Sequence, residues 1–524
     1  MLDKILENKG IVLYLLPLIL GILSVFSFQP FNFSLINFFV LPSFYLLLTY
    51  VNKKSKSVYR KKPYLKNLFL VGFGFGFGFY FAGIFWIVKS LTFDDSFKFL
   101  IPFAITIIPF FLALFTGLTT LIMGKFLSYN FSSILLFSGS FALTDYIRGK
   151  ILTGFPWNLW GYSWSWFTEI LQTLNSIGLF SFNLLAITIF TIPAVFFFNN
   201  YSTKKILTIS LSTVLIFLLY IYGTLTLNKN EKLLVGIDKK NKVYTKVISP
   251  NFLLEYDLTF EEVENKLKKL IKYSDPDPQK KTIFIWPEGV FTGYSFDEIY
   301  TFKDLIKENF NQNHQILLGI NMQDKKNEKY FNSLIVINNS FKILHQYKKQ
   351  KLVPFGEFLP FEIFLNKFGL KKITQGHGSF SKGIMQKNII LRNANILPLI
   401  CYEIIFPELV QKANIDTNLI VNISEDGWFG NTIGPHQHFA KAIFRSIENN
   451  SFLVRSANKG ISAIISNKGK IVKKLDINET GSIEMDVPLL TTEYKNKNDL
   501  IFFILLFTYL IIFLIFKNKT NVKH

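Results

Sequence analysis

Cysteine is almost absent from this chain, since Cys401 is the only one in 524 residues. A single cysteine excludes a disulfide within the chain, so the redox state of its compartment does not follow from cysteine usage. Acidic residues are also scarce: 36 Asp and Glu stand against 57 Lys and Arg, giving a net charge of +21. No helix-turn-helix, zinc-ligand spacing or phosphate-cradling glycine loop accompanies this charge, so the sequence does not favour a nucleic-acid partner.

Hydrophobic residues, in contrast, are abundant. They make up 50% of the chain, 59 of them are Phe, and the mean hydropathy of +0.30 is too high for an ordinary soluble enzyme. They gather in eight stretches that we interpret as membrane helices, at residues 11–27, 32–50, 68–88, 99–122, 131–147, 178–198, 205–225 and 499–516. The first stretch lacks a small-residue cleavage pattern, which favours an uncleaved helix over a signal peptide.

These stretches predict three parts of the chain. Residues 1–225 form a membrane domain, 226–498 a soluble domain, and 499–524 a last membrane helix with a short basic tail. The soluble domain would then be inserted between the seventh and eighth helices of an eight-helix bundle. Basic residues outnumber acidic ones in every piece that alternation puts on one side, namely the loops 51–67, 123–130 and 199–205 and the tail. The positive-inside rule makes that side cytoplasmic and places the soluble domain outside. If one of the eight predicted spans were not a span, the predicted side of the soluble domain would be inverted.

Two features of the membrane domain have two interpretations each. Gly72, Gly74, Gly76 and Gly78 alternate with Phe, which indicates either close helix packing or drift in composition. Four of the seven tryptophans lie in residues 153–166, which we call the Trp-rich loop. This density is typical of an aromatic belt at the membrane interface, although a role in holding lipid is also open.

The soluble part has strand-like and helix-like runs in alternation, which predicts an α/β domain. The expected strands are Val243–Ile248, Thr282–Trp286, Gln315–Ile320, Ser333–Ile337, Ile396–Ile400, Leu419–Ile423 and Ser462–Ile465. The expected helices are Glu261–Tyr273, Asp297–Phe310 and His436–Asn449.

Three strand-like runs end abruptly in a reactive side chain. Residues 396–400 lead to Cys401, 282–286 to Glu288, and 341–347 to Lys348 and Lys349. Strand ends in an open sheet converge on one face, so we expect a carboxylate, an ammonium and a thiol to meet there. The carboxylate would take the thiol proton, the ammonium would stabilise negative charge, and the thiolate would attack a carbonyl. Without the other two groups, a single cysteine is more often a small buried hydrophobic residue than a nucleophile. Glu288, likewise, would more often be an exposed residue of a turn.

The order of these groups, in Trp286–Glu288, Leu352–Glu357 and Cys401–Glu403, resembles the carbon–nitrogen hydrolase (nitrilase) superfamily. Within it, the chain is most similar to the apolipoprotein N-acyltransferases, whose pattern continues through Asn422–Gly430, Gly434–His438 and Arg455–Ser462. The resemblance implies an αββα sandwich for the soluble domain. One departure is Tyr256, where relatives carry Trp.

The resemblance also implies the roles of single residues. The implied catalytic residues are Glu288, Lys349 and Cys401, and the implied supporting or substrate-binding residues are Glu357, Tyr402, Glu403 and Trp428. The spacing of eight residues before Glu357 selects Lys349, and Lys348 is the alternative if the register is shifted by one. The main-chain N–H of Tyr402 directly follows the nucleophile, which suits an oxyanion donor.

We expect no metal and no other cofactor. His436 and His438 are two residues apart on a predicted helix, so they lie on different faces, and the sequence places no suitable third ligand near them.

The implied activity is transfer of an acyl chain from a phospholipid, through a Cys401 thioester, to the amine of an S-diacylglyceryl cysteine at the start of an apolipoprotein. The expected partners are the phospholipid donor, the diacylglyceryl apolipoprotein acceptor and membrane lipid. The expected location is the bacterial cytoplasmic (inner) membrane, with the catalytic domain on its outer, periplasmic face. A membrane-tethered amidase of the nitrilase type and a non-enzymatic membrane scaffold are the alternatives.

Overall fold

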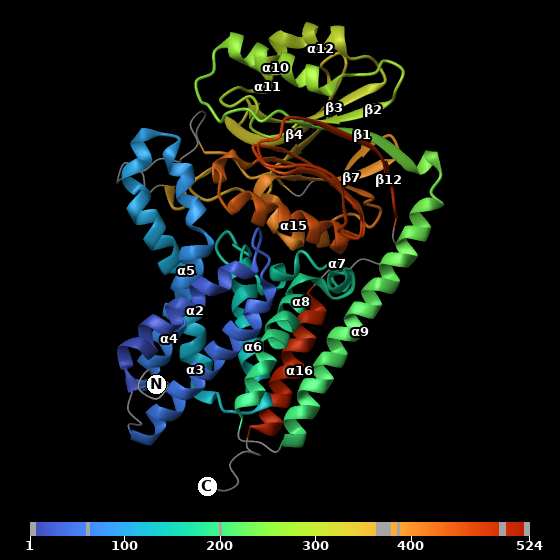
Figure 1. Cartoon of the computed structure of the whole chain (residues 1–524). Coiled ribbons are helices and arrows are strands. Elements are labelled where there is room, and N and C mark those ends of the chain that lie inside the picture. Colours follow the sequence, from blue (N-terminus) through green and yellow to red (C-terminus); the bar gives the residue numbers. More distant parts are fainter. Residues whose placement is uncertain are drawn as a thin grey trace. The chain divides into compact units, whose positions relative to one another are not determined.

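The computed structural model describes residues 7–58, 63–198, 202–362, 379–384, 388–491 and 499–517. The chain divides into two compact units (Figure 1). The helical unit comprises Met1–Val88, Phe99–Thr226 and Asn498–His524, and the sandwich unit comprises Lys89–Lys98 and Leu227–Lys497. The sequence did not indicate that Lys89–Lys98 belongs with the sandwich. Parts of the predicted basic loops, 59–62 and 199–201, and the tail 518–524 lie outside the described residues.

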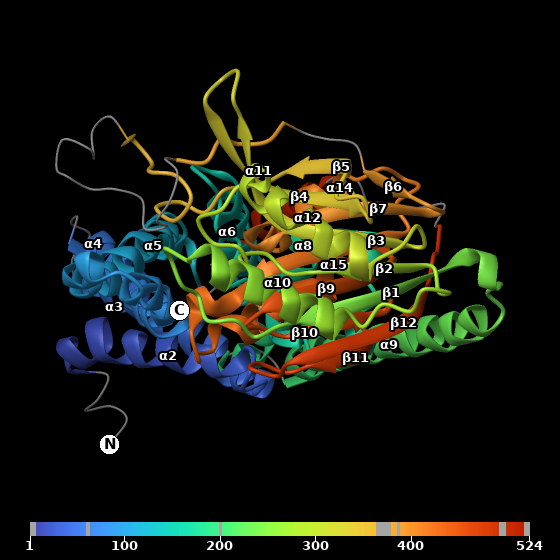
Figure 2. The ribbon, with the colours of Figure 1, turned by 90° about the horizontal axis from the view of Figure 1, so that it is seen from above.

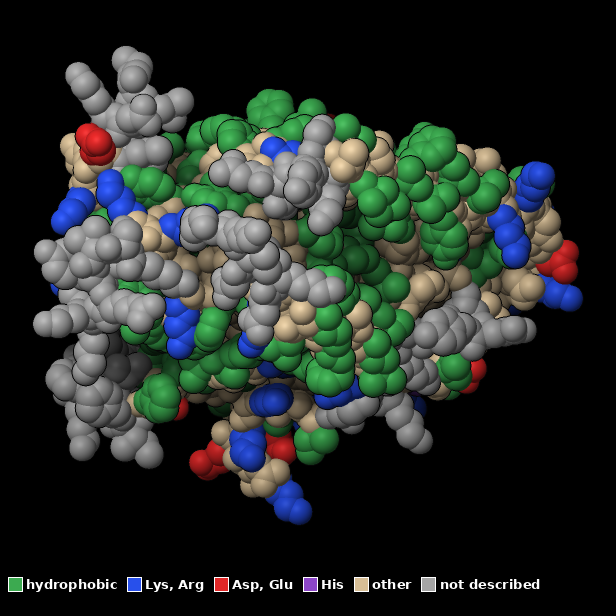
Figure 3. Space-filling view, turned by 90° about the horizontal axis from the view of Figure 1, so that it is seen from below, with side chains coloured by type: hydrophobic (Ala, Val, Ile, Leu, Met, Phe, Trp, Pro, Cys, Tyr) green, Lys and Arg blue, Asp and Glu red, His purple; other side chains and the backbone are tan. Residues whose placement is uncertain are grey.

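The helical unit consists of apolar helices. They are α2 (Leu16–Ser24), α3 (Asn37–Val58), α4 (Pro63–Gly83), α5 (Ile101–Met123), α6 (Phe131–Lys150), α7 (Thr168–Leu171), α8 (Leu174–Thr191), the part of α9 (Ser202–Val235) up to Thr226, and α16 (Leu500–Phe516). Among the described residues, five helical stretches are long and apolar enough to cross a membrane: Ser34–Lys54, Tyr64–Gly83, Asp95–Phe126, Leu174–Phe197 and Lys205–Val235. Ile11–Ser27 and Leu500–Phe516 are shorter apolar helices. Hydrophobic side chains cover much of the face seen in Figure 3. The count of eight spans stays a prediction.

The glycines of α4 lie at two helix contacts. A Cβ on Gly72 would be 1.9 Å from the Thr120 hydroxyl oxygen of α5, and one on Gly78 would be 2.3 Å from the Leu18 carbonyl oxygen of α2. Any larger residue would push these helices apart, because the clash is with a backbone or a helix-bound side chain. The structure therefore favours close packing over drift in composition as the reason for these glycines.

The Trp-rich loop packs three of its four indoles inside the protein. Trp160 stacks on Phe79 with ring centres 5.1 Å apart, and Trp164 stacks on Phe190 at 5.2 Å. Trp157, Trp160 and Trp164 are buried, whereas Trp166 is 47% exposed. An aromatic belt needs indoles at the surface, so that interpretation fits Trp166 alone.

A buried ion pair of α6 holds this loop. Arg148 donates to Asp145 Oδ1 over 2.9 Å and also to the carbonyl oxygen of Phe155 in the loop. Asn183 of α8 donates to Asp145 Oδ2 over 2.9 Å and accepts the Gly161 N–H of the loop over 3.0 Å. Both charges and both loop contacts are thus satisfied within the helical unit.

The sandwich unit contains two six-stranded sheets. The first has the order β12-β1-β2-β3-β4-β5 and the second the order β11-β10-β9-β8-β7-β6. The strands of the first are β12 (Gly481–Pro488), β1 (Lys242–Ser249), β2 (Thr282–Ile285), β3 (His314–Asp324), β4 (Lys329–Asn338) and β5 (Ile343–Lys348). Those of the second are β11 (Ile471–Leu475), β10 (Ser462–Ile465), β9 (Phe452–Asn458), β8 (Leu419–Glu425), β7 (Ala394–Ile400) and β6 (Ile389–Leu391).

Helices cover the outer face of each sheet, so the predicted αββα sandwich is confirmed (Figures 1 and 2). The elements α10 (Phe260–Ser274), α11 (Phe296–Ile299) and α12 (Lys303–Asn309) lie over the first sheet, and α14 (Pro407–Gln411) and α15 (Gly434–Asn449) over the second. The inner faces of the two sheets share one apolar core, and α10 to α12 form another with the first sheet. Neighbouring strands β1, β2 and β3 are parallel, as are β7, β8 and β9.

One predicted helix is wrong as drawn from the sequence. The stretch Asp297–Phe310 is not continuous: α11 ends at Ile299, a 3-10 turn covers Tyr300–Phe302, and α12 begins at Lys303. Apolar spacing survives across the break, with Ile299 and Ile306 both buried. Periodicity therefore does not reveal a 3-10 break within a helical stretch.

Candidate active site

Cys401 lies at the junction of β7 and a 3-10 helix over Cys401–Ile405. Its φ of +48° is in the left-handed region, which a residue with a Cβ adopts only under constraint from its surroundings. The side chain is buried, and burial is the main factor that raises the pKa of its thiol. The Glu288 charge raises this pKa further, and the Lys349 charge opposes both. The sulfur is therefore a protonated thiol at rest, within the field of both groups.

Glu288, Lys349 and Glu357 form a buried cluster with a fourth residue, Asn332. Lys349 Nζ is 2.9 Å from Glu357 Oε1 and 3.3 Å from Glu288 Oε1. Asn332 of β4 donates from Nδ2 to the same two oxygens, over 2.7 and 2.6 Å respectively. The amide and the ammonium thus hold the two carboxylates side by side. The sequence did not indicate Asn332, although a buried Asn within an apolar strand was the available signal.

Local backbone contacts position Glu288. The Trp286 N–H donates to the Leu317 carbonyl over 2.8 Å, which extends the pairing of β2 with β3 to the residue before Pro287. Gly319 of β3 then leaves room for the carboxylate residue, because a Cβ there would lie 2.8 Å from Glu288 Cα. Glu288 Oε2 accepts the Glu425 N–H over 3.1 Å. The acid is therefore held by groups of both sheets.

The three neighbouring lysines have different environments. Lys348 Nζ lies 3.9 Å from the centre of the Phe331 ring, and Lys351 pairs with Glu408 over 2.9 Å. Lys349 alone among them enters the cluster, and its side chain is 1% exposed. Burial acts to lower the pKa of Lys349, but the charges of Glu288 and Glu357 outweigh it and raise that pKa, so the amine stays protonated.

Glu403 connects the segment after Lys349 to the strand before Cys401. Its carboxylate accepts four hydrogen bonds, from the N–H groups of Ile400, Gln350 and Lys351 and from the hydroxyl of Tyr347, over 2.8, 2.6, 3.1 and 3.0 Å. Burial raises the pKa of Glu403 to about 7, against the effect of these N–H donors. Glu403 therefore fixes the segment after Lys349 to the strand that ends at Cys401.

The rings of Tyr402 and Trp428 pack against other aromatic side chains of the sandwich unit. The Tyr402 ring packs on Phe406 with centres 5.1 Å apart. The Trp428 ring lies between Phe93, at 5.5 Å, and Tyr256, at 6.2 Å. Tyr256, the departure noted in the sequence, thus contributes to an aromatic cluster with a residue of Lys89–Lys98.

A second buried group lies behind the nucleophile. Cys401, Asp426 and His438 each offer a ligand atom, and these atoms lie within 4.8 Å of one another. By donor type they could hold a metal ion. Arg455, however, donates to Asp426 Oδ2 over 2.7 Å, and the same nitrogen is 3.1 Å from His438 Nδ1. A cation at this position would meet the guanidinium, so the donor set does not fit a metal. The sequence did not indicate that His438 and Asp426 approach Cys401.

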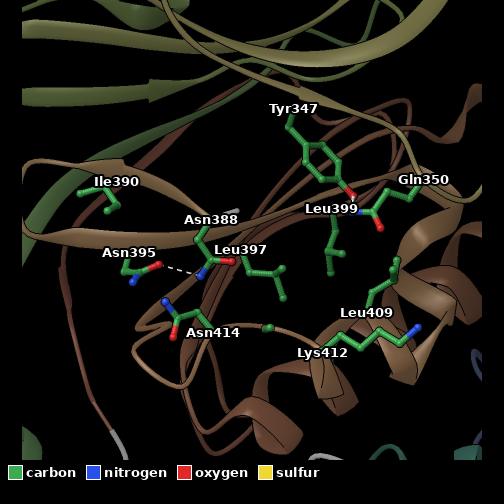
Figure 4. A pocket seen from close by; sticks show the side chains of 11 residues that line it. Tyr347, Gln350, Asn388, Ile390, Asn395, Leu397, Leu399, Leu409, Lys412 and Asn414 are labelled. Carbon is green, nitrogen blue, oxygen red and sulfur yellow. Dashed lines mark hydrogen bonds between the residues drawn. The ribbon is translucent and has the colours of Figure 1, made fainter. Parts of the chain in front are cut away.

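A cavity of about 550 Å³ opens elsewhere on the sandwich unit (Figure 4). Its wall is formed by Tyr347, Gln350, Asn388, Ile390, Asn395, Leu397, Leu399, Leu409, Lys412, Ala413 and Asn414. Neither the nucleophile nor the Glu288 cluster lines it. Two of its lining residues, Tyr347 and Gln350, also donate hydrogen bonds to Glu403, from the Tyr347 hydroxyl and the Gln350 N–H.

Comparison with known proteins agrees with this architecture. A family model described as carbon–nitrogen hydrolase matches residues 255–495, so the sandwich and its buried cysteine are those of this class of protein. A model of the apolipoprotein N-acyltransferase N-terminal domain matches residues 20–192. The apolipoprotein N-acyltransferase of Rickettsia typhi is 31% identical, over 94% of this chain and 97% of its own. That of Rhizobium leguminosarum is 31% identical, over 93% and 92%. The chain belongs to the apolipoprotein N-acyltransferase family.

Among solved structures, this chain is similar to Nit3 of Saccharomyces cerevisiae, a member of the nitrilase superfamily. The identity is 15%, the TM-score is 0.35, and the match covers 54% of this chain and 96% of that one. Together with the apolar helices, the family relationship makes the chain a bacterial membrane protein.

Proposed function

We propose that this protein transfers an acyl chain from a phospholipid to the N-terminal amine of a lipoprotein by way of a thioester on Cys401. One observation supports this above all. The buried Lys349 ammonium is held between the carboxylates of Glu288 and Glu357, and its charge and that of Glu288 both act on the Cys401 thiol. An acid–base group, a fixed cation and a nucleophile are the parts that acyl transfer through a covalent intermediate requires.

In the first half-reaction, Glu288 takes the thiol proton as the sulfur attacks the ester carbonyl of the lipid. Because the pKa of Cys401 is raised, proton transfer and attack proceed together rather than from a preformed thiolate. The carbonyl oxygen gains negative charge, which Lys349 and the Tyr402 main-chain N–H stabilise. The C–O bond then breaks, the lysophospholipid oxygen takes the proton back from Glu288, and a thioester remains.

In the second half-reaction, the α-amine of a diacylglyceryl cysteine attacks the thioester carbonyl and gives one proton to Glu288. Collapse of this intermediate breaks the C–S bond and forms an amide, and Glu288 returns the proton to sulfur. Glu357 and Asn332 keep Lys349 and Glu288 in place through both steps. Trp428 and Tyr402 offer apolar walls beside the nucleophile for the acyl chain and the acceptor.

Intact mass measurement of the lipid-incubated protein tests this proposal. We expect one acyl chain to be added to the wild type, none to Cys401→Ala, and loss of the adduct when a diacylglyceryl lipopeptide amine is supplied. Release of free fatty acid without a stable adduct would instead indicate hydrolysis, as in an amidase. Absence of both products, with lipoprotein N-acylation unchanged in Cys401→Ala cells, would indicate a non-catalytic scaffold.

We also propose that the sandwich unit lies on the periplasmic face of the cytoplasmic membrane. The support is the excess of basic residues in the loops that alternate with it. Since Cys401→Ala removes the only cysteine, single cysteines can report topology in that background. Lys329→Cys, exposed in β4, should react with a membrane-impermeant maleimide in intact spheroplasts. Lys125→Cys, exposed after α5, should react only after permeabilisation. The reverse pattern would refute this orientation.

A further inference from the structure

The buried group behind Cys401 has no part in the acyl-transfer steps above. It consists of Ser424 at the end of β8, Asp426 in the turn that follows, His438 of α15 and Arg455 of β9, and each of these side chains is fully buried. Asp426 accepts from the Ser424 hydroxyl over 2.7 Å and from Arg455 over 2.7 Å. Burying several ionisable groups is unfavourable unless each is paired. A cluster of this kind beside a nucleophile therefore indicates a role in the site.

His438 joins this cluster to the nucleophile's own backbone. Its Nδ1 is 2.9 Å from Asp426 Oδ1, and its Nε2 is 3.2 Å from the carbonyl oxygen of Cys401. A carbonyl oxygen only accepts hydrogen bonds, so this second contact requires a proton on Nε2.

Two protonation states meet that requirement. In the imidazolium, Nδ1 donates to Asp426; in the neutral form with the proton on Nε2, Nδ1 accepts from Arg455 at 3.1 Å. Burial lowers the pKa of His438, Asp426 raises it, and Arg455 and Lys441 lower it again. The tautomer protonated on Nδ1 alone would turn a lone pair toward the Cys401 carbonyl. Asp426 favours the imidazolium and Arg455 the neutral form with the proton on Nε2, and the contact with the Cys401 carbonyl selects these two states over the third.

The contact with the Cys401 carbonyl has a mechanical use. Cys401 adopts a φ of +48°, a strained conformation that sets the direction in which its thiol leaves the backbone. The Phe429 ring, with its centre 5.3 Å from that of His438, packs beside the imidazole. A buried donor on the Cys401 carbonyl stabilises this conformation with respect to relaxed ones.

We propose that His438, oriented by Asp426 and Arg455, is a positioning residue: its Nε2–H holds the Cys401 carbonyl and thereby keeps the nucleophile aimed at the acyl carbonyl. The role rests on the proposed function, since it concerns the geometry of attack by Cys401. It requires no proton transfer by His438.

A matched pair of substitutions isolates this one hydrogen bond. In His438→Gln the amide nitrogen is as many bonds from Cα as Nε2 is, so the donor can be kept. His438→Met has the same length and no donor, and both variants lack the charge. We expect the rate of Cys401 acylation by phospholipid to stay within about threefold of wild type for His438→Gln. For His438→Met it should fall by about tenfold or more, the effect of one buried hydrogen bond.

Alkylation of Cys401 by iodoacetamide supplies the second readout. Alkylation depends on thiol ionisation and access, whereas acylation also depends on the direction of attack. We expect the two variants to share one alkylation pH profile and to differ in acylation. Thermal unfolding reports whether both are folded, and His438→Asn, whose shorter amide does not reach the Cys401 carbonyl, replaces His438→Met if the latter is not.

Three results would overturn the proposal or its basis. Equal acylation by folded His438→Gln and His438→Met would show that the donor is irrelevant. Equal factors of loss in alkylation and acylation would show that His438 acts on thiol ionisation instead. A wild type that forms no acyl adduct would refute the proposed function. If the wild type is acylated and the two variants do not differ, only the role of His438 is refuted.

Discussion

Replacing Asn332 by Leu should slow acylation of Cys401 while leaving the strand intact. The side-chain amide donates to Glu288 Oε1 over 2.6 Å and to Glu357 Oε1 over 2.7 Å, but the strand's contact with Lys349 runs through the Asn332 carbonyl. Hydrogen bonds to charged groups contribute about 1.5–3 kcal/mol each. If the loss of orientation at Glu288 accounts for about 2 kcal/mol, the acylation rate falls by about 30-fold.

The rate of adduct formation, followed by intact mass over time, measures this effect. Asn309→Leu is the matched control, because its exposed amide donates to Leu305 within its own helix and its loss should leave acylation unchanged. Asn332→Asp should be worse than Asn332→Leu. It exchanges a donor for a third negative charge beside two carboxylates and raises the pKa of the Cys401 thiol further.

A double-mutant cycle tests the bridging role itself. Without Asn332, Glu288 and Glu357 repel each other with Lys349 as the remaining link, and Glu357→Gln removes that repulsion. Glu357→Gln should therefore be much less harmful in the Asn332→Leu background than in the wild type. Independent, additive losses in acylation rate would refute the idea that the amide holds the two carboxylates together.

Three further outcomes follow from the site and the helical unit. Glu288→Gln removes a charge that raises the pKa of Cys401, so iodoacetamide should alkylate the variant faster than wild type at fixed pH, while lipid acylation is lost; slower alkylation would contradict this. Glu403, with its pKa raised from 4.5 to about 7, retains a proton that the unfolded chain has lost, so its contribution to the free energy of unfolding declines as pH rises through that window. The difference in melting temperature between Glu403→Gln and wild type should shift in favour of the variant from pH 5 to 8, and a constant difference would argue against the raised pKa. Arg148→Met leaves the buried Asp145 uncompensated and should destabilise the helical unit by about 3 kcal/mol or more, measured by thermal unfolding in detergent; a loss below about 1 kcal/mol would contradict the pairing.

Much of the sandwich could be predicted because its strands are buried on both faces. Six of the seven expected strands, such as Leu419–Ile423, lie within observed strands, and the seventh, Thr282–Trp286, extends one residue past the end of β2, because a continuous apolar run admits few other structures. Strands β6, β9, β11 and β12 were missed, and β9 (Phe452–Asn458) is the one that bears on the site. It carries Arg455 and Asn458, which are buried by hydrogen bonds that the sequence does not display. Sequence patterns register apolar burial but not the burial of paired polar groups.

The site shows the same division. The ends of three strands indicated where Glu288, Lys349 and Cys401 lie, because sheet geometry brings such ends together. The spacing to Glu357 selected Lys349, and the structure places its ammonium in the cluster; strand alternation alone could not exclude Lys348, since a shift of one residue exchanges the two faces. Asn332 and His438 could not be assigned from the sequence. Their importance depends on which acceptors face them across sheets, which is a property of tertiary packing.

The pairing of β1 with β12 has a consequence for the life of a newly made chain. The first strand of the sandwich lies between β2 and the last strand, which ends at Pro488. The acid and the amine come from one sheet and the sulfur from the other. A ribosome-bound chain that still lacks β12 has an open edge at β1, so the first sheet is completed only after almost the whole domain has been made. The strand that closes this edge is therefore among the last parts of the sandwich to leave the ribosome.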